Sequence, residues 1–144
     1  MRATESTSLR AEAEQQVGPI TRTQIVRFAG AGGDFNPIHH DEEFARSAGQ
    51  PTVFAMGQLQ AAMLARFAAE WLGAGALRSL SVRFSAKVWP GDVLSLHGAL
   101  TSAEIVDGER RVAATLQAVN QNGDVVARGT VTAASDAALP EATG

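Results

Sequence analysis

The stretch best suited to chemistry is GGDFNPIHHDEEFA, residues 32 to 45. Asp34 and His39 stand five positions apart, with Asn36 and Pro37 between them. Proline fixes its own φ and biases the preceding residue toward extended backbone, so this segment can hold both side chains in place. A carboxylate and an imidazole that share one water form a general acid and base pair, as the addition of water to a double bond requires. We therefore take Asp34 and His39 as candidate catalytic residues.

Two alternatives to this interpretation stay open. Asp, Asn and Pro are common in turns, so Asp34 could cap a turn while His39 is an ordinary buried histidine. A metal site built on His39, His40 and Asp41 is a weaker alternative, because adjacent side chains tend to diverge and His97 is the one further histidine. We expect no metal and no cofactor, and we expect His40 and His97 to be exposed or structural.

A second candidate feature is PTVFAMGQL, residues 51 to 59, which leads into a predicted long helix. Free backbone N–H groups at the start of a helix can polarise a carbonyl oxygen, and glycine allows that oxygen to come close. Gly57 is the donor that this pattern favours. The alternative is that Gly57 only relieves crowding where the chain enters the helix.

The elements that position these residues can be predicted from the flanking sequence. Thr21 followed by Gln24 is typical of a helix start, and the glycines at residues 30–33 end that helix. Asp41 predicts a second helix start, and Gly49 its end. The candidate loop therefore lies between two short helices.

The remainder of the chain predicts one long helix and a sheet. Residues 58–71 are rich in alanine, lack glycine and proline, and place large apolar side chains four positions apart. Alternating patterns then predict antiparallel strands near residues 80–88, 94–100, 112–118 and 125–131, joined by turns. The sequence therefore predicts an α+β domain in which a meandering sheet wraps the helix, and whose free sheet edge favours dimers.

Composition limits the kinds of protein this can be. The chain has 144 residues, 45% of them apolar, which suits one domain. A net charge of -3 argues against a nucleic-acid or anionic-membrane surface, and the absence of cysteine excludes disulfides and a cysteine nucleophile. No signal peptide or membrane span is evident, so we expect a cytoplasmic protein. Residues 1–16 and 135–144 are polar and are expected to be flexible ends of a domain at residues 17–134.

Three motifs together, GGDFNPIHHDEEFARSAG, VFAMG and VWPGDVL, resemble the MaoC-like, (R)-specific enoyl-CoA hydratase family over roughly residues 19 to 134. The resemblance implies a hot-dog fold, an antiparallel sheet wrapped around a long central helix, usually as a dimer; we expect a homodimer, with a heterodimer as the alternative. It also implies reversible hydration of trans-2-enoyl thioesters of CoA or acyl carrier protein to (3R)-hydroxyacyl thioesters. In that reaction Asp34 and His39 hold and activate a water, the Gly57 N–H polarises the thioester carbonyl, and Asn36 supports the loop.

Three residues depart from the family pattern. Phe28, Gly32 and Met56 stand where the family often has tyrosine, serine or threonine, and histidine. They favour a second hypothesis, a non-catalytic hot-dog subunit that binds acyl thioesters or completes a heteromeric dehydratase. Thioester hydrolysis on the same fold is a third, because fold alone does not decide the reaction. Arg83 and Lys87 could meet phosphates of CoA or an acidic carrier, or simply face solvent.

Overall fold

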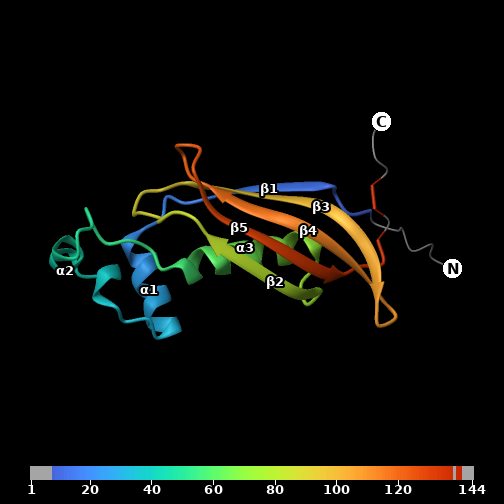
Figure 1. Ribbon diagram of the computed structural model, residues 1–144, viewed down its shortest axis with the longest axis horizontal. Helices are drawn as coiled ribbons and strands as arrows, with labels where there is room; N and C mark the ends of the chain where they lie inside the picture. The colour runs from blue at the N-terminus through green and yellow to red at the C-terminus, as the bar shows by residue number, and fades with distance from the viewer. Residues whose placement is uncertain (1–7, 138, 141–144) are drawn as a thin grey trace.

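The computed structural model describes residues 8–137 and 139–140. Within them the chain forms the following elements in order: β1 Glu12–Val17, α1 Arg22–Gly32, the 3-10 helix η1 Pro37–His39, α2 Glu42–Ser47, α3 Gly57–Leu72, β2 Leu77–Phe84, β3 Leu94–Val106, β4 Glu109–Val119 and β5 Val125–Ala134. The strands make one antiparallel sheet in the order β1-β3-β4-β5-β2. The sheet curves over α3 (Figure 1), so the predicted α+β hot-dog fold is confirmed.

The path of the sheet differs from the predicted meander. Strands β3, β4 and β5 follow one another through hairpins, but β2 pairs with β5 and lies at the edge opposite β1. The turn at Trp89–Asp92 is therefore part of a crossover. β2 also ends at Phe84, because the N–H groups of Ser85 and Ala86 both donate to Val126 O and the ladder stops there. An alternating apolar pattern identifies a strand but not the strand that pairs with it. The predicted meander therefore missed that β2 pairs with β5.

The N-terminal segment is more ordered than predicted. Residues 12–16, expected to belong to a flexible arm, form most of β1 and pair with β3 from Glu12 opposite Ala99 to Val17 opposite Leu94. The Trp71 side chain donates from Nε1 to Arg10 O at 3.1 Å. Strand pairing uses backbone hydrogen bonds and needs few large apolar side chains. The polar composition of this segment therefore did not show that it would be flexible. Residues 1–7 lie outside the described residues.

The C-terminal segment is also held in part. Strand β5 ends at Ala134, and the Arg110 guanidinium donates to Ser135 O and to Ala137 O beyond it. Leu139 packs against the core. The predicted flexible tail at residues 135–144 is therefore wrong for its first residues, while residues 138 and 141–144 lie outside the described residues.

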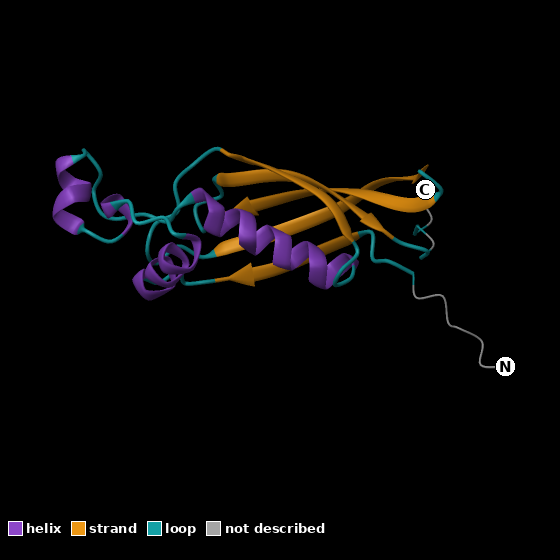
Figure 2. Cartoon of the chain, turned by 90° about the horizontal axis from the view of Figure 1, so that it is seen from below, coloured by secondary structure: helices purple, strands orange, loops and turns teal. Residues whose placement is uncertain are grey.

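Helix α3 lies across the inner face of the sheet (Figure 2), one residue longer at each end than the predicted 58–71. Its buried side chains are Leu59, Gln60, Leu64, Phe67, Ala68, Trp71 and Leu72. Gly98 on β3 faces the Trp71 ring, and only a residue without a side chain leaves room for it. None of the helices in residues 8–137 and 139–140 is long and apolar enough to cross a membrane.

The short helices gather at the end of the sheet where α3 begins (Figures 1 and 2). Thr21 caps α1 by accepting from Gln24 N at 3.0 Å, and Asp41 caps α2 by accepting from Phe44 N at 3.1 Å, both as predicted. Helix α1 ends at Gly32 and is capped by Gly33, whose φ of 72° is the left-handed conformation that glycine tolerates best. The candidate loop is thus fixed at both ends by capped helices.

Candidate active site

The turn of η1 sets the direction of the loop that carries Asp34 and His39. Asn36 caps this turn, since its side-chain oxygen accepts from Ile38 N at 3.1 Å. Pro37 supplies the first position of the turn, where its missing N–H has no helical partner to lose. His39 is the last residue of η1, so the Asn-Pro step determines where its ring points.

The His39 ring is buried and its orientation is fixed. Its exposed fraction is 7%, and its Nδ1 lies 2.7 Å from the carbonyl oxygen of Phe54. A carbonyl can only accept, so Nδ1 carries a proton and donates it. In the neutral ring, Nε2 then keeps its lone pair and is the nitrogen free to take up a proton.

Asp34 faces that free nitrogen. Its Oδ2 lies 3.5 Å from His39 Nε2, while its Oδ1 accepts from Asn36 N at 3.3 Å. The Asp34 side chain is 45% exposed, so solvent reaches the pair. When His39 is neutral, Oδ2 and Nε2 are both acceptors and cannot bond to each other. One water, which has two O–H donors, can satisfy both.

Arg22 ties together the segments around this loop. Its guanidinium lies 2.6 Å from Glu42 Oε2 on α2 and donates to Thr52 Oγ1 at 3.0 Å, so α1, α2 and the segment before α3 are joined. The hydrogen bond from Arg22 lowers the pKa of Glu42 below its usual value. Glu42 is therefore held in its charged form and anchors α2 to α1.

Gly57 is the first residue of α3, and no hydrogen bond engages its N–H within the described part of the chain. A Cβ at this position would lie 3.1 Å from two atoms of the Phe84 ring, so glycine permits a close approach here. Gly57 lines a pocket of about 380 Å³ with Phe54, Ala55, Gln60 and residues 84–87. A free N–H at a helix start is the kind of donor that can bind a carbonyl oxygen.

Phe54 connects the His39 loop to this pocket. Its ring makes an edge contact with the His39 ring at 5.4 Å, and Phe54 is one of the residues that line the pocket. Trp89 packs on Phe54 at 5.6 Å, and Lys87 Nζ lies 5.4 Å from the centre of the Phe54 ring. Phe54 is therefore the residue that His39 contacts and that also lines the pocket of Gly57, while Asp34 and His39 themselves do not line that pocket.

The predicted site residues lie in two neighbouring places. Asp34, Asn36 and His39 meet in one loop, and Gly57 lines the adjoining pocket. His40 is exposed, within 3.4 Å of Phe35 O. Neither Phe54 nor Gln60 was predicted, although Gln60 is detectable as a polar residue in the apolar stripe of α3.

Of the residues that depart from the family pattern, Met56 is buried and precedes α3. Phe28 packs against the core, and Gly32 closes α1. None of the three is a polar group able to hydrogen bond to Asp34 or His39 through its side chain.

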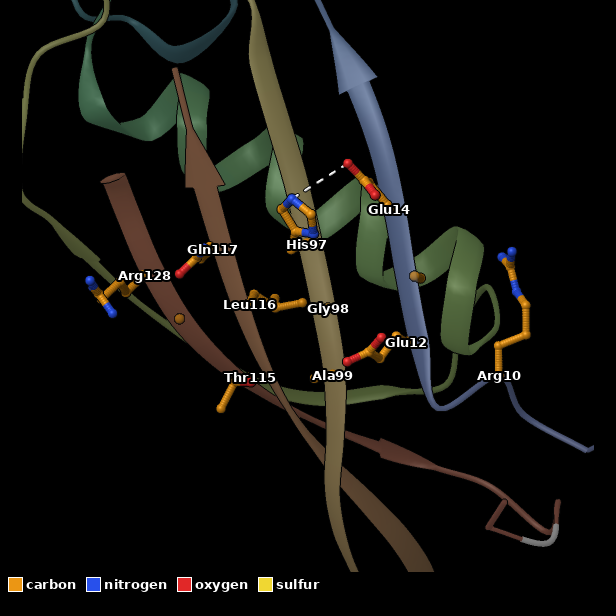
Figure 3. A pocket seen from close by; sticks show the side chains of 12 residues that line it. Arg10, Glu12, Glu14, His97, Gly98, Ala99, Thr115, Leu116, Gln117 and Arg128 are labelled. Carbon is orange, nitrogen blue, oxygen red and sulfur yellow. Dashed lines mark ion pairs between the residues drawn. The ribbon is translucent and has the colours of Figure 1, made fainter. Parts of the chain in front are cut away.

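A larger hollow, of about 760 Å³, lies on the outer face of the sheet (Figure 3). Its lining includes His97, which faces Glu14 at 3.5 Å, and the exposed Arg128. Neither Asp34, His39 nor Gly57 lines this hollow. Charged and small polar side chains on an open sheet face are typical of a solvated surface.

Comparison with known proteins identifies the family of the chain. The family model described as MaoC like domain matches residues 4–122. The (R)-hydratase from A. caviae involved in PHA biosynthesis is 22% identical, with a TM-score of 0.77, over 93% of this chain and 99% of that chain. R-hydratase PhaJ1 from Pseudomonas aeruginosa is 26% identical, with a TM-score of 0.76, over 95% and 92%.

A third solved structure, the ChsH1-ChsH2 complex from Mycobacterium tuberculosis, is 23% identical, with a TM-score of 0.75, over 89% of this chain and 98% of that chain. No curated protein matches the sequence. Because the family model spans most of its 144 residues, the chain belongs to the MaoC-like domain family.

Proposed function

We propose that this protein catalyses the reversible hydration of trans-2-enoyl thioesters to (3R)-hydroxyacyl thioesters. The observation that carries the proposal is the buried His39, whose Nδ1 donates to Phe54 O at 2.7 Å while Nε2 faces Asp34 Oδ2 at 3.5 Å. That arrangement leaves two acceptors converging on the place of one water. Membership of a family whose solved relatives include (R)-hydratases supports the same reaction.

Asp34 and His39 orient and activate this water. Its two O–H groups point to Asp34 and His39, so an oxygen lone pair is left for the substrate. As oxygen adds to C3, the C2=C3 electrons move toward the thioester carbonyl and one water proton passes to the pair. A proton then returns to C2, so the product contains one added water. Asn36 supports this step by capping η1 and by donating from its backbone N–H to Asp34.

Gly57 acts on the other end of the conjugated system. Charge develops on the thioester carbonyl oxygen as C3 is attacked, and a donor placed there stabilises the transition state. The N–H of Gly57 begins α3, where unpaired N–H groups and the helix dipole favour negative charge. The substrates we propose are thioesters of CoA or of an acyl carrier protein. We also propose that two copies of the chain form a dimer in the cytoplasm.

A second candidate function is a non-catalytic subunit that binds acyl thioesters or completes a heteromeric dehydratase. Two similar structures are complexes of different chains, ChsH1-ChsH2 and HadBC, the latter a 3R-hydroxyacyl-ACP dehydratase. Met56, a buried residue beside Gly57, has an apolar side chain that offers the site no strong hydrogen-bond donor. This function requires a partner chain for any turnover.

The test follows the conjugated enoyl thioester absorbance of a short 2-enoyl-CoA with the purified chain. Asp34→Asn keeps the size of the side chain but removes its charge, and Glu43→Gln makes the matched change at an exposed carboxylate nearby. We expect the signal to decay with the original protein and with Glu43→Gln. With Asp34→Asn the rate should fall by about 10²-fold or more.

Three other outcomes contradict the proposal. Release of free thiol would identify a hydrolase. Equal rates for Asp34→Asn and the original protein would remove Asp34 from the reaction. Absence of turnover by the original protein with both CoA and carrier-protein substrates would favour the non-catalytic subunit.

A further inference from the structure

Asp92 is a buried carboxylate that the proposed reaction does not use. It lies in the connection between β2 and β3, and 6% of it is exposed. Among the residues that the structure describes, it is the one acidic side chain that is buried. Because a buried charge is costly unless hydrogen bonds compensate it, the partners of Asp92 indicate what this carboxylate serves.

Both carboxylate oxygens of Asp92 accept hydrogen bonds. Oδ2 accepts from Trp89 N at 2.9 Å, and Oδ1 accepts from Gln121 Nε2 at 2.9 Å. Gln121 Oε1 in turn accepts from Val93 N at 3.0 Å, which fixes the orientation of the Gln121 amide. Both partners of the carboxylate are donors, as an ionised, acceptor-only carboxylate requires.

A continuous series of hydrogen bonds leads from Asp92 toward the catalytic loop. Its first member is the peptide group that joins Val88 to Trp89. The N–H of this group donates to Asp92 Oδ2, and its carbonyl oxygen accepts from Ala55 N at 2.9 Å. The same peptide group therefore links the carboxylate to the segment that precedes α3.

The second member is the peptide group that joins Phe54 to Ala55. Its N–H makes the hydrogen bond to Val88 O, and its carbonyl oxygen accepts from His39 Nδ1 at 2.7 Å. The series thus runs from His39 through two peptide groups to Asp92, and each group in it donates to the next.

Such a series transmits charge by polarisation. The negative charge of Asp92 polarises both peptide groups in the same direction, so the Phe54 carbonyl oxygen becomes a stronger acceptor. Val88 and Ala55 are 1% and 4% exposed, so water does not screen the middle of the series. A stronger acceptor at Nδ1 stabilises the positive charge that His39 gains when Nε2 takes a proton, as a directly bonded carboxylate does for a catalytic histidine.

We infer that Asp92 is a positioning residue for the proposed reaction, and that its charge acts on His39 through the peptide groups 88–89 and 54–55. The inference rests on the proposed role of His39 as the group that takes a proton from water. No proton passes along the series, because Nδ1 keeps its proton while Nε2 gains and loses one. A purely structural Asp92 would hold the turn at residues 89–92 and leave His39 unaffected.

The test moves the charge and keeps the hydrogen bonds. Asp92→Asn alone leaves an oxygen for Trp89 N but sets one NH₂ group against that of Gln121. Adding Gln121→Glu restores an acceptor there, and position 121 is exposed. The double variant thus keeps the net charge and the pattern of donors and acceptors, but its charge no longer ends the series. Asp124→Asn, at an exposed position of the neighbouring turn, is the control.

Two readouts are measured on samples that urea unfolding shows to be folded. The first is the NMR resonance of the His39 Nδ1 proton, which lies further downfield when its hydrogen bond is stronger and needs no turnover. We expect it to move upfield in the double variant and to stay in place in Asp124→Asn. The second is turnover of a short 2-enoyl-CoA, where kcat should fall by about three- to tenfold in the double variant. KM should stay nearly constant, because Asp92 does not line the pocket of Gly57.

The outcomes separate this inference from the proposed function. An upfield shift in the double variant supports the coupling of Asp92 to His39 even if no protein hydrates an enoyl thioester. An unmoved resonance in a folded double variant overturns the inference whether kcat falls or not, while turnover by the original protein leaves the proposed function standing. If the double variant does not fold, Asp92→Ser replaces it, because the hydroxyl oxygen can accept from Trp89 N without carrying a charge.

Discussion

Replacing Gly57 with alanine separates the role of its N–H from its role in folding. The added Cβ would lie 3.1 Å from Cδ2 and Cε2 of Phe84 and 3.2 Å from Cζ. These contacts are tight, but the Phe84 side chain is partly in solvent, with 44% of it exposed, and can move by the few tenths of an ångström required. The fold should therefore tolerate Gly57→Ala.

The expected effect on stability is small because two terms oppose each other. Alanine favours helical backbone over glycine by up to about 1 kcal/mol, while crowding against a packed neighbour typically costs about 1–3 kcal/mol. Movement of the exposed ring reduces the second term, so we expect the free energy of unfolding in urea to change by about 1 kcal/mol or less.

The expected effect on activity is large. The methyl group occupies pocket space where the thioester oxygen must approach the N–H, and loss of one such donor lowers kcat by about 10²–10³-fold. The assay follows enoyl-CoA absorbance alongside urea unfolding of the same samples. Retention of kcat within about threefold by a folded Gly57→Ala would refute the assignment of Gly57 as the carbonyl contact. If a double variant, Gly57→Ala with Phe84→Ala, regained the original kcat, the loss of activity in Gly57→Ala would be due to the displaced Phe84 ring.

Two further predictions concern the scaffold. Gly98→Ala places a Cβ in the space of the Trp71 ring, 2.8 Å from Cε3, and should lower the free energy of unfolding in urea by about 1–3 kcal/mol. Gly30→Ala is the control, because a Cβ there meets nothing within 4 Å and should not destabilise the fold. Hydrogen bonds from Arg78 and then Arg111 lower the pKa of Glu109 from 4.5 to about 2. Its charge thus stabilises the fold above pH 4.5, and this contribution fades as pH falls toward 2. Glu109→Gln should melt at a lower temperature at pH 7, with a difference that shrinks over that interval; a constant difference would contradict the pairing.

Local signals in the sequence were enough to predict the helices and turns around the site. Thr21 and Asp41 carry side-chain oxygens that satisfy the first N–H groups of a helix, and such caps act within three residues. The hairpin glycines are equally local, since Gly108 and Gly123 adopt the positive φ values that tight turns need. Short-range chemistry of this kind can be recognised without knowledge of the fold.

Pairing between distant segments was beyond the sequence. Strand β2 pairs with β5, and residues 12–16 pair with β3. These pairings depend on which edges of the sheet are open, and an alternating sequence pattern does not identify a strand's partner. The same limit applied to the site. Asp34 and His39 were found because they lie in one loop, whereas the Phe54 carbonyl that orients His39 is 15 residues away.

Turnover of a short 2-enoyl-CoA by His39→Gln, measured beside His40→Gln, decides whether the Asp34 and His39 pair carries out hydration. The two residues are neighbours of the same type, but His39 is buried at Phe54 and His40 is exposed. Loss of a general base typically lowers the rate by about 10²–10⁴-fold. We predict such a loss in His39→Gln, with His40→Gln close to the original rate and both variants folded. Similar rates in both folded variants would contradict hydration by the Asp34 and His39 pair.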